Sequence, residues 1–346
     1  MKKTSFVLAA ALAATCTLSA ESRLKVVATS FPHYDWTRQI LGDAADRVEL
    51  TLLQQSGADL HSYQPTADDL LKVARCDLFV YVGGESDEWT ERALKQKGNS
   101  RRRALSLLSA LGDAAKEEKV VEGMEHEHHH RDKDHGHAKE RGRGHDDHGH
   151  GNAKKHGHGH DDDRDEEHEL DEHVWLSLRN AAKLTQAIAG ELAALDPANA
   201  AAYRRNAAAY RAKLSALDRA YADAVARAPR KTILVADRFP FRYLADDYGL
   251  AYFAAFAGCS AESEASFKTV AFLAKKTDEL KLPVILTIEG AKHKIAETVR
   301  NATERRDQRI LALDSLQSTG GEAAEAARYL DVMARNLEVL KAALGN

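Results

Sequence analysis

Cysteine is scarce in this chain of 346 residues, which contains only three. Cys16 falls within an N-terminal leader, so Cys76 and Cys259 are the two that would remain in a mature protein. A small exported scaffold held together by disulfides would need many more. Stability must therefore come from hydrophobic cores. A bridge between Cys76 and Cys259 is left open, because pairing requires close Cα atoms, and we interpret both as packing residues.

The chain also lacks a strong excess of charge of either sign. It has 49 basic and 53 acidic side chains, which gives a formal net charge of −4. Nucleic acids and anionic membranes attract strongly basic surfaces. The overall charge balance therefore does not support either kind of partner. We expect no nucleic-acid partner.

Long apolar runs are absent after the leader. Residues 1–20 begin with Met1-Lys2-Lys3 and continue with an apolar run from Phe6 to about Leu18, the layout of a secretory signal. That run is too short to span a bilayer comfortably, and no later stretch approaches about 20 apolar residues. We expect cleavage near Glu21 and a periplasmic or secreted protein. A lipoprotein anchor at Cys16 is less favoured, because Thr15 is a poor residue at the preceding position.

Hydrophobic residues make up 44% of the chain, enough for two compact lobes with separate cores. In residues 21–116, and again in residues 230–346, short apolar runs alternate with helical patterns. Such alternation predicts βαβ units and a parallel sheet in each part. We therefore expect an α/β fold with two similar parallel-sheet lobes. The expected strands are 24–30, 48–53, 78–82, 232–236, 251–256, 284–288 and 309–313.

Residues 171–229 lie between the expected lobes and contain a long amphipathic pattern. Apolar side chains recur every three or four residues from Tyr203 to Val225, which places them on one helical face. Asp196 would cap the helix, Pro197 would be its first residue, and Pro229 would end it. We expect one long helix that joins the lobes.

Residues 117–170 form the segment with the most biased composition, and most of it lacks apolar side chains that could be buried. We expect a disordered loop. A neutral imidazole is a good zinc ligand, because the histidine pKa of ~6.5 leaves a nitrogen lone pair available. We favour metal binding by this loop over a merely solvated linker or a tag. It holds thirteen of the 17 histidines: His126, His128, His129, His130, His135, His137, His145, His148, His150, His156, His158, His160 and His168.

One stretch of this loop, residues 126–130, satisfies the H-E-x-x-H pattern of zinc peptidases. That motif functions on a packed helix, where two histidines on one face bind zinc and the glutamate activates water. The loop has no apolar face that could pack. Nothing else in the chain supplies a convincing general base, so an enzyme is not favoured.

Two further segments carry a family resemblance. Residues 57–66, with His61, resemble the first ligand segment of the zinc- and manganese-binding proteins of ABC importers. Residues 171–176, with His173, are similar to that family's second histidine segment, which also follows a His-rich loop. The resemblance covers essentially the whole mature chain in the same order, including the long helix.

The resemblance implies that His61 and His173 bind one metal ion in the cleft between the lobes. His61 also follows an expected strand, and open α/β sheets place ligand sites at the carboxyl ends of strands. The alternative is that each is an ordinary surface or core histidine. His33 and His293 lie outside the matched segments, and we expect them at the surface.

The expected third ligand departs from the family pattern. The family's usual histidine aligns with Arg238, which has no lone pair to donate. Asp237 is the substitute candidate, with a role in ion pairing or helix capping as its alternative. Glu262 and Glu264 are further candidates. Asp314, after the last expected strand, resembles the family's aspartate segment and is the expected fourth ligand, although such a residue often caps a helix instead.

The resemblance implies a monomeric protein that captures Zn²⁺ outside the cytoplasmic membrane and delivers it to an ABC permease. The alternatives are a manganese-binding importer component and a zinc-binding surface or adhesion protein without a permease. Imidazole ligands favour zinc, whereas a carboxylate in place of a histidine favours manganese.

Overall fold

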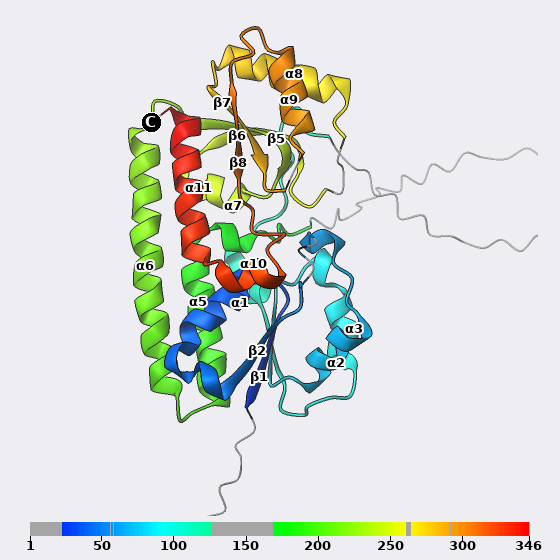
Figure 1. Cartoon of the computed structure of the whole chain (residues 1–346), viewed down its shortest axis with the longest axis vertical. Coiled ribbons are helices and arrows are strands. Elements are labelled where there is room, and N and C mark those ends of the chain that lie inside the picture. The colour runs from blue at the N-terminus through cyan, green and yellow to red at the C-terminus, as the bar shows by residue number, and fades with distance from the viewer. Residues whose placement is uncertain are drawn as a thin grey trace, which may run out of the picture.

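The computed structural model describes residues 23–55, 57, 59–125, 169–260, 264–290 and 292–345 (Figure 1). The expected signal peptide at 1–20, the thirteen histidines of the expected loop and Glu262 lie outside these residues. Within the described part, no helix combines the length and the apolar character needed to cross a membrane.

The N-terminal lobe is built on a four-stranded parallel sheet in the order β2-β1-β3-β4. Val26 and Val27 are neighbours in the central strand β1 and are buried in two different apolar clusters, so both faces of the sheet are covered. A parallel sheet needs such covering, because its crossover helices lie on both faces. The elements are β1 (Leu24–Ala28), α1 (Phe31–Leu41), β2 (Val48–Leu52), α2 (Ala67–Arg75), β3 (Leu78–Tyr81), α3 (Trp89–Lys95), β4 (Arg103–Ser106) and α4 (Leu107–Leu111).

The C-terminal lobe repeats this arrangement with the sheet order β6-β5-β7-β8. Ile285 and Leu286 of β7 again face two separate clusters. Counted within each lobe, both sheets have the strand order 2-1-3-4, so the prediction of two similar parallel-sheet lobes is confirmed. The elements are β5 (Thr232–Phe239), α7 (Arg242–Tyr248), β6 (Ala251–Ala257), α8 (Phe267–Glu279), β7 (Val284–Ile288), α9 (Lys294–Ala302), β8 (Arg309–Leu313), α10 (Gly321–Ala326) and α11 (Tyr329–Leu344).

A long helix, α6 (Ala200–Arg227), runs beside both lobes, as predicted (Figure 1). Helix α5 (Leu178–Leu195) and α11 pack along it, and neither was predicted. The start of α6 differs from the prediction, because Asn199 rather than Asp196 is the N-cap residue. The Asp196 carboxylate instead accepts hydrogen bonds from the Asn199 side chain and the Tyr203 hydroxyl, both at 2.7 Å. One apolar cluster includes side chains of both sheets and of α6, so the lobes share a core.

The expected limits of the disordered segment, 117 and 170, need correction. Residues 117–125 are described and packed: Met124 is buried in the main cluster, and Glu125 forms a parallel bridge with Phe256 of β6. Glu117 forms an antiparallel bridge with Leu170 on the far side of the segment. The burial of the apolar Met124 side chain favours packing of this stretch against the core.

Candidate metal site

His61 lies in a short 3-10 turn, Leu60–Ser62, that follows β2 at the carboxyl end of the N-terminal sheet. Asp59 caps this turn by accepting a hydrogen bond of 3.0 Å from the His61 amide. The His61 Nδ1 atom lies 2.7 Å from Ser86 Oγ, beyond the end of β3. This contact holds the ring with its Nε2 atom toward His173.

His173 lies directly before the 3-10 turn Val174–Leu176, which leads into α5, and it is fully buried. Its Nδ1 atom lies 2.8 Å from Asp171 Oδ1, which also accepts a hydrogen bond from the His173 amide. A carboxylate on Nδ1 holds the proton there and leaves the Nε2 lone pair free for a metal ion. Gly258 packs against the other side of the ring, because a Cβ atom at this position would lie 3.0 Å from His173 Cε1.

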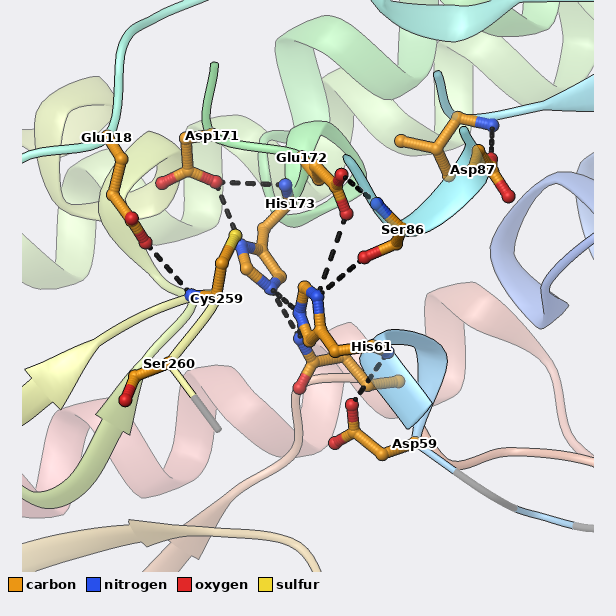
Figure 2. Close-up of polar contacts among 12 residues, drawn as sticks. Asp59, His61, Ser86, Asp87, Glu118, Asp171, Glu172, His173, Cys259 and Ser260 are labelled. Atoms are coloured by element: carbon orange, nitrogen blue, oxygen red, sulfur yellow. Dashed lines mark hydrogen bonds and ion pairs between the residues drawn. The ribbon is translucent and has the colours of Figure 1, made fainter. Parts of the chain in front are cut away.

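The two imidazoles point toward one another, with their Nε2 atoms 3.1 Å apart (Figure 2). An ion bound to both nitrogens at zinc-like lengths of ~2.05 Å would subtend an angle of about 100°, close to tetrahedral. Burial lowers the pKa of His61 to about 3, and the nearby His173 ring and Arg238 guanidinium act in the same direction against Asp59. The His61 ring is therefore neutral at physiological pH and able to bind a cation.

An acidic side chain lies on the Nδ1 side of each histidine ring. Asp171 supports His173, and Glu172 Oε2 lies 3.7 Å from His61 Nδ1. The other Glu172 oxygen accepts a hydrogen bond of 2.8 Å from the Ser86 amide. Burial raises the pKa of Glu172 to about 7. Gly84 makes room for this side chain, because a Cβ atom there would lie 2.6 Å from Glu172 Oε1.

Cys259 is the third potential ligand in this group. Its Sγ atom and one nitrogen from each of His61 and His173 all lie within 4.8 Å of one another. In the described part of the chain, this is the one group of three or more histidine, cysteine or acidic side chains gathered closely enough to hold a metal ion. Both Cys76 and Cys259 are free, so the bridge between them that was left open is not formed. The interpretation of Cys259 as a packing residue needs correction, because its sulfur lies in the group with His61 and His173. Burial, followed by the charge of Glu118, raises the pKa of the Cys259 thiol.

Gln317 also enters the site and was missed by the sequence analysis. Its Nε2 atom lies 3.1 Å from His61 Nε2 and contacts His173 Nε2. Its Oε1 atom accepts a hydrogen bond of 3.1 Å from Ser315 Oγ. Rotation of the amide by half a turn would present the oxygen to a cation. Gln317 lies three residues after Asp314, and its neutral amide carries no charge or metal-binding motif that would have marked it in the sequence.

Neither expected carboxylate ligand joins this group. Asp237 accepts hydrogen bonds of 2.9 Å from the Arg238 amide and from Thr287 Oγ1. Asp314 Oδ1 accepts one of 2.9 Å from the Leu316 amide. Both carboxylates thus accept local hydrogen bonds, which differ from the ion pairing and helix capping considered as their alternative roles. Glu264 is exposed at the surface.

Arg238 occupies the position at which the family resemblance implies a histidine. Its Nη2 atom lies 2.6 Å from Asp59 Oδ2, and its Nη1 atom donates a hydrogen bond of 3.4 Å to the Ser260 carbonyl. Burial acts to raise the pKa of Asp59, but the hydrogen bond and charge of Arg238 outweigh it and lower that pKa. The side chain therefore links the C-terminal lobe to the turn that carries His61.

The remaining two histidines of the folded part lie outside this group. His33 is fully buried rather than exposed, which corrects its expected surface position. Its Nε2 atom accepts a hydrogen bond of 3.0 Å from the Ser30 amide, at the start of α1. His293 is partly buried and immediately precedes α9.

Comparison with known proteins places the whole fold in one family. The family model described as zinc-uptake complex component A, periplasmic (ZnuA), matches residues 26–343. The zinc-binding lipoprotein AdcA of Streptococcus pneumoniae is 31% identical over 93% of this chain, which spans 56% of that relative, or about half its length. The high-affinity zinc uptake system protein ZnuA of Bacillus subtilis is 31% identical over a match that covers 93% of this chain and 88% of the B. subtilis protein.

Solved structures agree with this comparison. The Zn(II)-bound ZnuA-like domain of S. pneumoniae AdcA superposes with a TM-score of 0.66 at 26% identity, covering 94% of this chain and all of the domain. The metal-dependent lipoprotein YcdH of B. subtilis gives a TM-score of 0.68 at 26% identity, covering 93% of this chain and 99% of its own. Both support the two-lobe α/β fold.

Proposed function

The chain belongs to the ZnuA family of periplasmic zinc-uptake components, and from this we propose that it captures Zn²⁺ outside the cytoplasmic membrane and delivers it to the permease of an ABC importer. The observation that carries this proposal is the distance of 3.1 Å between the Nε2 atoms of His61 and His173. Two imidazoles at this separation can share one ion, and zinc accepts histidine nitrogen readily.

Several features of the site suit capture and release rather than catalysis. The matched family is one of uptake components, and we propose that this protein has no catalytic activity. His173 is fully buried and His61 is nearly so, with 11% of its side chain exposed. A catalytic zinc site keeps one position open for water and places a general base beside it. The Glu172 carboxyl, 3.7 Å from His61 Nδ1, lies on that side of the ring, away from the Nε2 atom that faces His173.

We further propose that the leader at 1–20 is removed on export, that the mature protein is a monomer and that its protein partner is the membrane permease. The named relatives are zinc-binding or zinc-uptake proteins, which favours zinc over the alternatives of manganese import and of adhesion. We propose His61 and His173 as protein ligands through Nε2. Asp237 and Asp314 are not proposed as ligands, because their carboxylates bond locally.

The proposal is tested by restoring zinc uptake in cells that lack this protein and grow poorly when zinc is limiting. The wild-type gene should restore growth, and so should added zinc alone. A double variant His61→Ala/His173→Ala should fail to restore growth while being exported at wild-type levels. Full restoration by the double variant would overturn the assignment of these residues, and no growth response to zinc would overturn the transport function.

A further inference from the structure

We propose that Cys259 is the third protein ligand of the metal ion, so that the cleft presents two imidazole nitrogens and one sulfur. This inference rests on the proposed function, because it names the donor set of the same site. It also defines the class of ion that the protein takes, which is a borderline or soft cation rather than a hard one.

The fold places Cys259 at the site through its position after a strand. Strand β6 ends at Ala257, Gly258 lets the chain pass against the His173 ring, and Cys259 follows directly. The Cys259 amide donates a hydrogen bond of 2.9 Å to Glu118 Oε1, which fixes the backbone there. Figure 2 shows the Cys259 side chain beside the His173 ring.

The separations permit coordination with a small movement. The three ligand atoms lie within 4.8 Å of one another. A tetrahedral zinc ion with bonds of ~2.3 Å to sulfur and ~2.05 Å to nitrogen would bring these atoms to about 3.6 Å. A rotation about the Cα–Cβ bond of Cys259 can move its sulfur by such an amount. On binding, the thiol S–H bond breaks, a sulfur–metal bond forms, and the proton passes to solvent.

The other side chains near the histidines are poorer third ligands. Arg238 has no lone pair and is paired with Asp59. The Asp237 carboxylate is held by Thr287. Gln317 contacts both histidines, and its neutral amide suits the fourth position, since it adds an oxygen but no charge. Among the described residues grouped around the two histidines, the Cys259 thiolate is then the one anionic donor.

This donor set should discriminate between metals. Thiolate is a soft ligand that zinc accepts readily, whereas Mn²⁺ prefers carboxylate, carbonyl and water oxygens. A carboxylate as third ligand would have made the site harder and closer to a manganese site. With Cys259 in this position, the structure supports selection of zinc against manganese at the level of the ligands themselves.

Cobalt substitution tests the proposal on the full mature chain. Co²⁺ bonded to sulfur shows an intense near-ultraviolet charge-transfer band, and the thirteen histidines between residues 126 and 168 cannot contribute to it, because that segment contains no cysteine. The band should appear in the wild type and in Cys76→Ser, and it should be lost in Cys259→Ser. Cys76 is the matched control, because it is buried next to Val73 and is not in the group around His61. Absence of the band from the wild type, or its persistence in Cys259→Ser, would overturn the proposal.

A second measurement does not require Cys259→Ser to fold. In Cys76→Ser, Cys259 is the single cysteine of the mature chain, so its alkylation rate can be followed with and without Zn²⁺. With free Zn²⁺ at ~10 times its Kd, alkylation should slow about 10-fold, because only the unbound fraction of the protein presents a free thiolate. Equal rates while zinc remains bound through His61 and His173 would overturn the role of Cys259 alone. Absence of zinc binding that depends on the two histidines would overturn the proposed function instead.

Discussion

Arg238 Nη2 and Asp59 Oδ2 lie 2.6 Å apart and join the C-terminal lobe to the turn that carries His61. The two side chains are 16% and 18% exposed, so the pair is largely shielded from solvent. Removing one partner of a shielded pair leaves the other charge poorly compensated. The pair therefore helps to hold the His61 turn against the C-terminal lobe. Its arginine cannot bind the metal ion, because a guanidinium has no lone pair to donate.

This ion pair gives the first prediction, on the variant Arg238→Ala. The variant should lose about 1–3 kcal/mol of unfolding free energy, because it leaves the buried Asp59 carboxylate without its cationic partner. It should still bind zinc, because arginine is not a ligand. Urea denaturation of the metal-free protein measures the first effect, and chelator competition measures the second.

The matched control is Arg305→Ala. The Arg305–Asp307 pair has the same separation of 2.6 Å, but its side chains are 65% and 55% exposed. Such an exposed pair contributes only about 0–1 kcal/mol. An equal loss of stability in the two variants would show that the pair between Arg238 and Asp59 has no special role.

The second prediction concerns the two proposed histidine ligands. His61→Ala and His173→Ala should each weaken zinc binding by at least ~10–100-fold. Mutation of residues that only hydrogen-bond to a metal ligand already lowers metal affinity by that much. The gain in melting temperature on adding zinc should shrink in parallel, because zinc stabilises the folded state that binds it. Chelator competition and thermal unfolding check the two effects.

Asp237→Ala is the control for these variants and should keep nearly wild-type zinc affinity, because Asp237 bonds to Thr287. A large loss of affinity in Asp237→Ala would instead support that carboxylate as a ligand. Without metal, His173→Ala should be the less stable of the two histidine variants, because His173 is fully buried and bonded to Asp171.

The third prediction is a pH dependence that originates in His33. Burial lowers the pKa of His33 to about 3, against a hydrogen bond to the Val80 backbone that raises it. The unfolded chain binds a proton at this residue below about pH 6.5 while the folded protein does not, so stability should fall as the pH drops from 6.5 toward 3. His33 should contribute up to about 1.4 kcal/mol per pH unit across that window.

The variant His33→Asn isolates this effect. Its unfolding free energy should depend less steeply on pH between 6.5 and 3 than that of the wild type, whatever its absolute stability. The comparison uses metal-free protein, so that zinc release does not contribute. Parallel pH profiles for the two proteins would contradict the assignment.

The fourth prediction separates the cleft from the His-rich segment. Deleting residues 126–168 should remove weak zinc sites and leave one tight site, because His61, His173 and Cys259 all lie outside the deletion. The cut preserves Glu125, whose side chain accepts a hydrogen bond from the Ser266 amide. Calorimetry counts the sites, and loss of the tight site would place it in the deleted segment.

Much of the fold could be predicted because its buried strands are continuous apolar runs. The run VILTI of β7 is buried at every residue, as expected for a parallel strand covered on both faces. Strand β4 was missed because its sequence RALS has little apolar character and its first two residues are exposed. Helix α5 could have been found, since Leu184, Ile188 and Leu192 recur at helical spacing and are buried.

The site could be predicted only in part. His61 and His173 carry a chemical signal, since imidazole is a common ligand and each lies in a matched segment. Whether Asp314 or Gln317 turns toward them depends on the path of the loop after β8, which residue types alone do not specify. The approach of Cys259 depends on how the end of β6 meets a segment more than eighty residues earlier. A tertiary contact of this kind leaves no local pattern in the sequence.

The central claim is that one metal ion binds between the lobes at His61 and His173, and anomalous diffraction at the zinc absorption edge tests it most directly. Crystals of the zinc-loaded protein should show an anomalous peak about 2.0–2.1 Å from the Nε2 atoms of both histidines. A further bond of about 2.3 Å should join the ion to sulfur. An empty cleft in crystals that hold zinc only elsewhere on the chain would contradict the account.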